Sequence, residues 1–308
     1  MPCRRFERGL RAWLLAALCG LPWAACQAGA LQYCDHPAPL NAAQKDQLFR
    51  FGAIIKAELD DSGAPLALVA RSGLDLSRFG LRYSHAGVSL KASPNTRWSV
   101  RQLYYACDER RPRIFDQGLS GFLLGTDNPS IGYVSVVFMP AAEADELERA
   151  ALDNSRALQL LNATYSANAY AWGLQYQNCN QWVIELLAAA WGQLDDSAGG
   201  PRAQAQHWLA DRGYEPSQVE IGNRALTWAA AFVPWLHTDD HPTSDVEQMV
   251  YRISMPASIE GFVRATVPGA SRVEFCHTER RVVVHRGWEP IAEGCVPGPQ
   301  DRVIELAD

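Results

Sequence analysis

The sequence predicts an α+β protein built around an antiparallel sheet, and three observations support this class. Apolar residues recur at helical spacing in segments 41–59 and 180–191. Segment 83–91 alternates small or polar residues with apolar ones, and the turn residues Ser93-Pro94-Asn95 separate it from a second strand at 98–104. We therefore expect two adjacent antiparallel strands with helices packed on the sheet.

The remaining elements follow along the chain. The first helix is expected to end near residues 60–63, Asp-Asp-Ser-Gly, and a short strand follows at 66–71. Segment 132–139 is rich in β-branched and aromatic residues, which favours a strand that ends at Pro140. A helix is expected at 141–161, because acidic residues in its first turns favour a helix start.

The pattern changes after Pro201. Short helical pieces are expected at 202–212 and 223–236, then a linker at 237–244, and a hairpin at 272–285. We expect a main domain over 31–200 and a C-terminal extension of helices and a hairpin, 201–308, packed on it.

Residues 1–30 have the layout of a secretory signal peptide. Four arginines precede the apolar run 12–23, and small residues end the segment at Ala28-Gly29-Ala30. The mature chain is then expected to begin near Leu31 and to be periplasmic or secreted. A lipid anchor at Cys26 is the alternative, although Trp23 fits a lipidation signal poorly.

Charge and hydropathy exclude some classes of partner. Loss of residues 1–30 removes four arginines and one glutamate, which changes the net charge from −6 to −9. Nucleic acid is therefore not an expected partner. No later stretch reaches the ~20 apolar residues of a membrane span, so no transmembrane span is expected in the mature chain. The sequence indicates neither a cofactor nor an oligomeric state.

The cysteines of the mature chain are odd in number. Three of the eight cysteines lie in residues 1–30, which leaves five, and export favours their pairing. Cys276 with Cys295, and Cys34 with Cys107, are the preferred disulfides among the possible pairings. This preference leaves Cys179 as a thiol.

Cys179 lies in the predicted first turn of the apolar helix. A helix N-terminus favours a thiolate, and its N–H groups can stabilise an oxyanion. A cysteine at this place is about as often buried and inert. The amides of Asn178, Asn180 and Gln181 favour a polar cleft, since they are costly to bury without partners.

His85 opens the strand 83–91 and shares a strand face with the small residues Gly87 and Ser89. A histidine by itself is more often a surface or hydrogen-bonded core residue. A catalytic imidazole needs a group that accepts its second N–H. Gln102 on the next strand could do so, whereas Arg101 points the other way and cannot accept a hydrogen bond.

These two motifs resemble a known superfamily. The strand Ser84-His85-Ala86-Gly87-Val88 and the helix start Asn178-Cys179-Asn180-Gln181-Trp182 are similar to the histidine strand and nucleophile helix of NlpC/P60 papain-like cysteine peptidases and amidases. Here the histidine precedes the cysteine, as in the circularly permuted branch. The resemblance implies a papain-like core of permuted topology over about residues 65–192.

The resemblance also implies a function. It predicts an exported cysteine hydrolase or acyltransferase that acts on an amide, thioester or ester bond, with cell-envelope peptides or acyl groups as the substrate class. Cys179 would be the nucleophile, His85 the general base and Gln102 its orienting group. The N–H of Cys179, helped by the side-chain amide of Gln177 or Asn178, would stabilise the oxyanion. Tyr176 lies just upstream of Cys179 and is expected either to line a substrate cleft or to be an ordinary core residue. The alternative is an inactive envelope-binding protein of the same fold.

A second resemblance covers most of the mature chain. Segments 82–88, 176–187 and 273–288 are similar to an uncharacterised family of exported bacterial proteins. A metal site at His237, Asp239-Asp240 and His241 is disfavoured, because no standard ligand pattern completes it. A zinc site at Cys276-His277, His285 and Cys295 is disfavoured for the same reason. A redox role lacks a Cys-x-x-Cys motif at Cys179.

Overall fold

The computed structural model describes residues 39–106, 109–194, 200–222 and 233–306. The predicted signal peptide, Cys26, Cys34 and Cys107 lie outside these residues, and so does most of the helix expected at 223–236.

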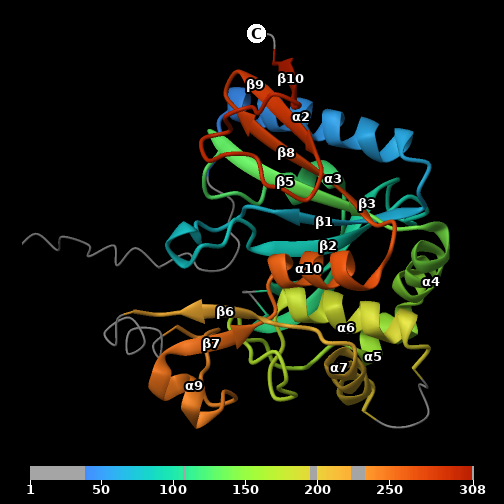
Figure 1. Ribbon diagram of the computed structural model, residues 1–308, viewed down its shortest axis with the longest axis vertical. Coiled ribbons are helices and arrows are strands. Elements are labelled where there is room, and N and C mark those ends of the chain that lie inside the picture. Colours follow the sequence, from blue (N-terminus) through green and yellow to red (C-terminus); the bar gives the residue numbers. More distant parts are fainter. Residues whose placement is uncertain (1–38, 107–108, 195–199, 223–232, 307–308) are drawn as a thin grey trace, which may run out of the picture. The chain divides into compact units, whose positions relative to one another are not determined.

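An eight-stranded antiparallel sheet organises the described residues (Figure 1), and this confirms the α+β class. The strand order is β10-β9-β8-β5-β1-β2-β3-β4, and β6 pairs with β7 apart from this sheet. The strands are β1 (Leu66–Arg71), β2 (His85–Leu90), β3 (Ser99–Ala106), β4 (Arg111–Gln117), β5 (Ile131–Phe138), β6 (Ser217–Glu220), β7 (Val250–Ile253), β8 (Ser271–Thr278), β9 (Arg281–Arg286) and β10 (Arg302–Glu305).

Each face of the sheet carries its own apolar core, because successive side chains of a strand point to opposite faces. On one face, Val69 and Val100 pack with residues of α2 (Ala42–Asp61) and α3 (Leu119–Leu123). On the other, Ala86 and Val88 pack with α4 (Ala141–Leu152), α6 (Cys179–Trp191), α7 (Pro201–Asp211) and α10 (Pro256–Thr266). Figure 1 shows α2 and α6 on opposite sides of the central strands.

Several elements differ from the sequence prediction. The helix expected at 141–161 is two helices, α4 and α5 (Asn154–Gln159), because Asp153 ends the first in an extended conformation and caps the second. Its side chain accepts hydrogen bonds from the N–H groups of Ser155 and Arg156. Strand β4, which the sequence reasoning missed, forms the sheet edge beside β3. Helix α3, also missed, follows β4 and packs in the core on the α2 side of the sheet.

The C-terminal segment completes the main sheet. Strand β8 pairs with β5, and the hairpin of β8 and β9 matches the one expected at 272–285. Segment 201–308 also contains β6, β7, α9 (Thr243–Gln248) and α10. Strand β10 pairs with β9 at the edge of the sheet. Residues far apart in the sequence therefore share one sheet.

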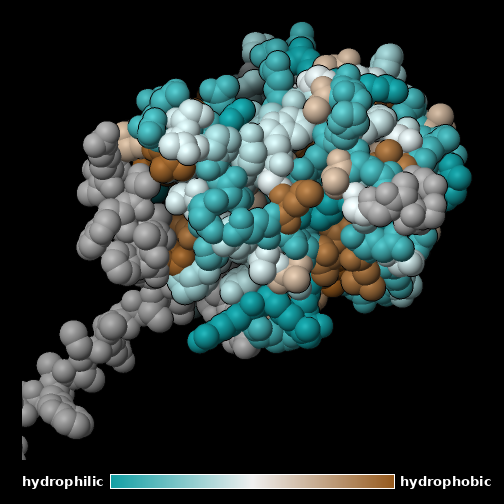
Figure 2. Space-filling model, turned by 90° about the horizontal axis from the view of Figure 1, so that it is seen from below, coloured by the Kyte–Doolittle hydropathy of each residue, from teal (hydrophilic) through white to brown (hydrophobic). Residues whose placement is uncertain are grey.

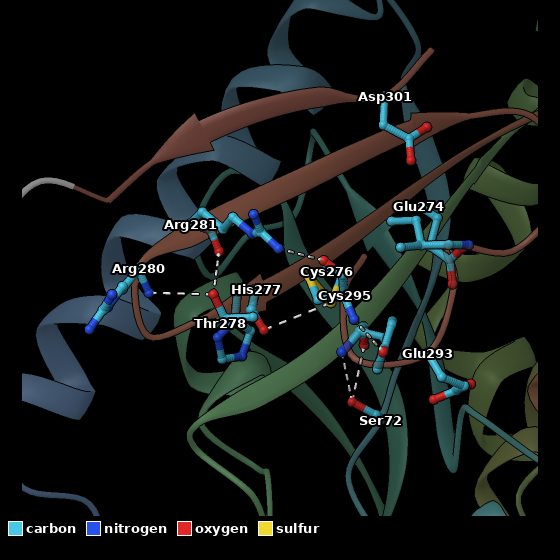
Figure 3. The surroundings of a disulfide bond; sticks show 12 residues. Ser72, Glu274, Cys276, His277, Thr278, Arg280, Arg281, Glu293, Cys295 and Asp301 are labelled. Atoms are coloured by element: carbon cyan, nitrogen blue, oxygen red, sulfur yellow. Dashed lines mark hydrogen bonds between the residues drawn. A yellow bond between two sulfur atoms is a disulfide. The ribbon is translucent and has the colours of Figure 1, made fainter. Parts of the chain in front are cut away.

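A disulfide joins Cys276 of β8 to Cys295, as predicted (Figure 3). Such a bond is typical of an oxidising compartment, which fits export. Within the described ranges, none of the helices combines the length and apolar character that crossing a bilayer requires. The face in Figure 2 is largely hydrophilic, with its hydrophobic residues in separate patches.

His277, which follows the disulfide cysteine, should make folding sensitive to acid. Burial against Phe51 lowers the pKa of His277 from 6.5 to about 4. Between these values the unfolded chain binds a proton that the folded protein excludes, so stability falls as the pH decreases from about 6.5 to about 4. The expected loss is about 3 kcal/mol, with no further change from this residue below that range.

The measurement is urea unfolding from pH 4 to 8 for the native protein and His277→Leu. The variant should lose less stability on acidification than the native protein does. His207→Leu is the control, because the side chain of His207 is 81% exposed. Equal acid sensitivity of the native protein and His277→Leu would contradict the assignment.

Candidate functional site

Cys179 is the first residue of helix α6, and the residue before it caps that helix. The side-chain oxygen of Asn178 accepts a hydrogen bond from the N–H of Gln181 at 2.7 Å. Cys179 carries a thiol, is 7% exposed and packs in the core on the α6 side of the sheet. The structure thus places the thiol at a helix N-terminus, where a thiolate is favoured.

His85 is the first residue of β2, and its ring is held by Gln102. The distance between Nε2 of His85 and Oε1 of Gln102 is 2.5 Å, and both residues are buried. The ring of Phe122 lies 5.9 Å from the imidazole, centroid to centroid. Arg101 pairs instead with Asp116. The strand alternation therefore identified the residue of β3 that reaches the imidazole.

The strands β2 and β3 separate beside His85. They pair only from Val88 to Leu90 of β2, although β3 continues beyond that point and pairs with β4 as far as Ala106. The first turn of α6 occupies this opening. Asn180 accepts a hydrogen bond from the N–H of Ala86 at 2.9 Å and donates to the carbonyl of Ser84 at 3.2 Å.

This arrangement, which we call the Asn180 clamp, fixes the start of α6 to the start of β2. The side chain of Asn180 bonds the N–H of Ala86 and the carbonyl of Ser84, which a neighbouring strand would otherwise bond. Asn180 thus binds the residue before His85 and the residue after it. In the sequence, Asn180 directly follows Cys179. The two sequence motifs, about ninety residues apart, therefore meet at the opening between β2 and β3.

Gly87 allows β3 to approach β2 where the strands begin to separate. A Cβ atom at residue 87 would lie 2.5 Å from Cγ1 of Val100 and 2.9 Å from the carbonyl oxygen of Arg101. Gly87→Ala should therefore push β3 away and lower stability by roughly 1–3 kcal/mol. Chemical denaturation would measure this. Gly261→Ala is the control, because nothing lies within 4 Å of its Cβ position.

Gln177 and Asn178, which were expected to assist at the oxyanion, both bind groups of the protein. The amide nitrogen of Gln177 donates to Glu185 at 2.6 Å and to the carbonyl of Leu160 at 2.9 Å. The amide nitrogen of Asn178 donates to the carbonyl of Ser254 at 3.2 Å, while its oxygen caps α6. Both amides hold the loop and helix that carry Cys179.

A buried ion pair on α6 supports that loop, and sequence reasoning missed it. Glu185 is fully buried and binds Arg202 of α7 through two contacts, at 2.8 and 3.0 Å. Arg202 also donates to the carbonyls of Gly173, Leu174 and Tyr176. An acidic residue within an otherwise apolar helix signals such a buried partner, because a charge is rarely buried alone.

A second buried network anchors the residues before His85. The hydroxyl of Tyr83 donates to Glu274 of β8, which also binds Arg82 at 2.9 Å and Arg272 at 3.2 Å. Burial, and next the negative charge of Glu274, raise the pKa of Tyr83 well above its usual value, so the phenol stays neutral. Strand β8, from the C-terminal segment, thus holds the histidine motif in place.

Tyr176, the expected substrate-site residue, stacks on His237 with ring centroids 4.3 Å apart. Its hydroxyl lies 3.2 Å from Asp239, and burial raises the pKa of Tyr176. His241 contacts the carbonyl of Asn168 at 2.7 Å. The linker 237–241 therefore packs on the loop before Cys179. Among the described residues, no group of three or more His, Cys, Asp or Glu side chains is arranged to hold a metal ion.

Comparison with known proteins gives one match. No curated protein and no solved structure matches the chain. The model of a family described as uncharacterised proteins conserved in bacteria matches residues 58–263, which include β2, β3 and α6. Because this match covers more than half of the chain, the protein belongs to that bacterial family, DUF2145.

Proposed function

We propose that the protein is an exported cysteine hydrolase or acyltransferase, with Cys179 as nucleophile, His85 as general base and Gln102 as the group that orients His85. The observation that carries this proposal is the Asn180 clamp, which ties the start of the thiol-bearing helix to the backbone on both sides of a histidine already held by an amide. The resemblance of both motifs to the permuted NlpC/P60 peptidases supports the same assignment.

The proposed reaction has two steps. His85 takes the proton of the Cys179 thiol, and the thiolate attacks the carbonyl carbon of an amide, ester or thioester. The tetrahedral intermediate collapses to an acyl thioester, and the imidazolium gives its proton to the leaving group. Water then attacks the thioester in a hydrolase, while a second nucleophile accepts the acyl group in an acyltransferase.

The helix N-terminus supplies the electrostatic part of this mechanism. Backbone N–H groups of a first helical turn point out of the helix end, and the helix dipole favours negative charge there. We assign the N–H of Cys179 to the oxyanion, since the amides of Gln177 and Asn178 hold other groups. The resemblance suggests a peptide or acyl group of the cell envelope as substrate.

Acylation by an activated ester tests the proposal. With p-nitrophenyl acetate, the native protein should release a burst of about one p-nitrophenolate per chain and gain one acetyl group on Cys179, which mass spectrometry of peptides would locate. Cys179→Ala and His85→Ala should show no burst. Acetylation confined to lysines, at equal rates in all three proteins, would contradict the proposal.

The second candidate is a binding protein of the cell envelope without catalysis. The burial of Cys179, which is only 7% exposed within an apolar core, favours it. The same experiment separates the two functions, because a buried, neutral thiol would give no acetyl-Cys179 even at saturating ester.

A further inference from the structure

Gln117, the last residue of β4, lies next to Gln102, the group proposed to orient His85. In the register of β3 and β4, Val100 lies opposite Gln117 and Gln102 opposite Phe115, so Gln102 and Gln117 share one face of the sheet. Oε1 of Gln117 accepts a hydrogen bond from Nε2 of Gln102 at 2.7 Å.

This contact determines which end of the Gln102 amide faces His85. A carboxamide has one oxygen that accepts and one nitrogen that donates. Because the Gln102 nitrogen is directed at Gln117, its oxygen is directed at Nε2 of His85, 2.5 Å away. An oxygen at that place requires a proton on Nε2. The neutral imidazole then carries its basic lone pair on Nδ1.

We infer that Gln117 is a positioning residue that selects the Nε2–H tautomer of His85, and so makes Nδ1 the nitrogen that accepts the thiol proton. The inference deepens the proposed function and rests on it for the role of Nδ1. Gln117 acts through Gln102 and does not touch the reacting atoms.

Helix α3 holds the Gln117 side chain from the other side. A Cβ atom at Gly121 would lie 3.1 Å from both Cγ and Nε2 of Gln117. The amide nitrogen of Gln117 thus faces α3, and its oxygen faces Gln102. The turn from β4 into α3 therefore supports both Gln117 and Phe122, which packs near the imidazole.

The test reads the tautomer of His85 by long-range ¹H–¹⁵N correlation in protein labelled at histidine. All proteins carry Cys179→Ser, because a thiolate at Cys179 would keep the imidazole of His85 protonated at both nitrogens. The signals of His85 are assigned by their loss when His85→Gln is added. In this background His85 should be mainly Nε2–H at pH 8. Gln117→Leu should lower the ratio of Nε2–H to Nδ1–H about tenfold, as expected for loss of one hydrogen bond.

Two variants complete the test. Gln117→Glu keeps an oxygen for the Gln102 nitrogen and should retain the Nε2–H tautomer, whereas Gly121→Ala should shift the ratio in the same direction as Gln117→Leu by displacing the amide. Arg113 of β4, whose side chain is 41% exposed and pairs with Glu109, provides the control, and Arg113→Ala should leave the ratio unchanged.

A dominant Nδ1–H tautomer, or a ratio that neither Gln117→Leu nor Gly121→Ala changes by more than twofold, would overturn the inference. The outcome does not depend on catalysis, since Cys179 is absent from the measured proteins. The proposed function would fail in a different way: the protein would give no p-nitrophenolate burst although the neutral ring of His85 carries its proton on Nε2.

Discussion

Glu185→Ala is expected to lower the free energy of unfolding by about 3–5 kcal/mol, because it leaves the buried guanidinium of Arg202 without its counter-charge. Glu185 is fully buried, and Arg202 is only 9% exposed. The amides of Gln177 and Gln206 also donate to this carboxylate, at 2.6 and 2.8 Å. One substitution therefore removes the acceptor of four hydrogen bonds.

Urea unfolding of Glu185→Ala and of Glu109→Ala checks this expectation. Glu109 pairs with Arg111 and Arg113 at the surface, so its loss should cost less than about 1 kcal/mol. Hydrogen exchange should also increase in the loop 173–177, whose carbonyls Arg202 holds. Similar costs for the two substitutions would show that the buried pair does not support this loop.

Asn180→Leu is expected to lower the free energy of unfolding by roughly 2–4 kcal/mol, since it leaves the N–H of Ala86 and the carbonyl of Ser84 without their partner. Asn180 is 2% exposed, so water cannot readily replace its amide. The start of α6 should then move relative to β2. The rate of Cys179 alkylation at pH 7 should fall toward that of His85→Ala.

Asn95→Leu provides the matched control, because the exposed Asn95 also donates a side-chain hydrogen bond, to the carbonyl of Asp116 at 2.7 Å. It should cost less than about 1 kcal/mol and leave Cys179 alkylation unchanged. If Asn180→Leu loses stability but keeps native alkylation kinetics, the clamp stabilises the fold without serving the proposed pair.

Local sequence patterns predicted the elements that carry the two motifs. Period-two alternation predicted β2, and β-branched and aromatic residues predicted β5, each nearly to the residue; turn residues at 93–95 identified β2 and β3 as antiparallel partners. The same alternation selected Gln102 over Arg101 as the neighbour of His85. Such patterns succeed where one strand face is buried and its period is regular.

The support of the site could not be predicted, since it depends on contacts between distant segments. Strand β8 reaches Tyr83 across 191 residues of sequence, and Arg202 reaches Glu185 only because α7 packs on α6. Amide side chains were also hard to assign. Three amide residues close together in the sequence have different roles. Asn180 clamps a strand, Gln177 binds a buried carboxylate, and Asn178 caps a helix.

The pairing of Cys179 with His85 is tested most directly by the rate of Cys179 alkylation by iodoacetamide as a function of pH, in the native protein and in His85→Ala. The native thiol is expected to ionise at least about one pH unit below the ordinary value of about 8.5, and the thiol of the variant is expected to ionise near that value. A native profile centred near 8.5, or one that the loss of His85 does not change, would contradict the proposed pair.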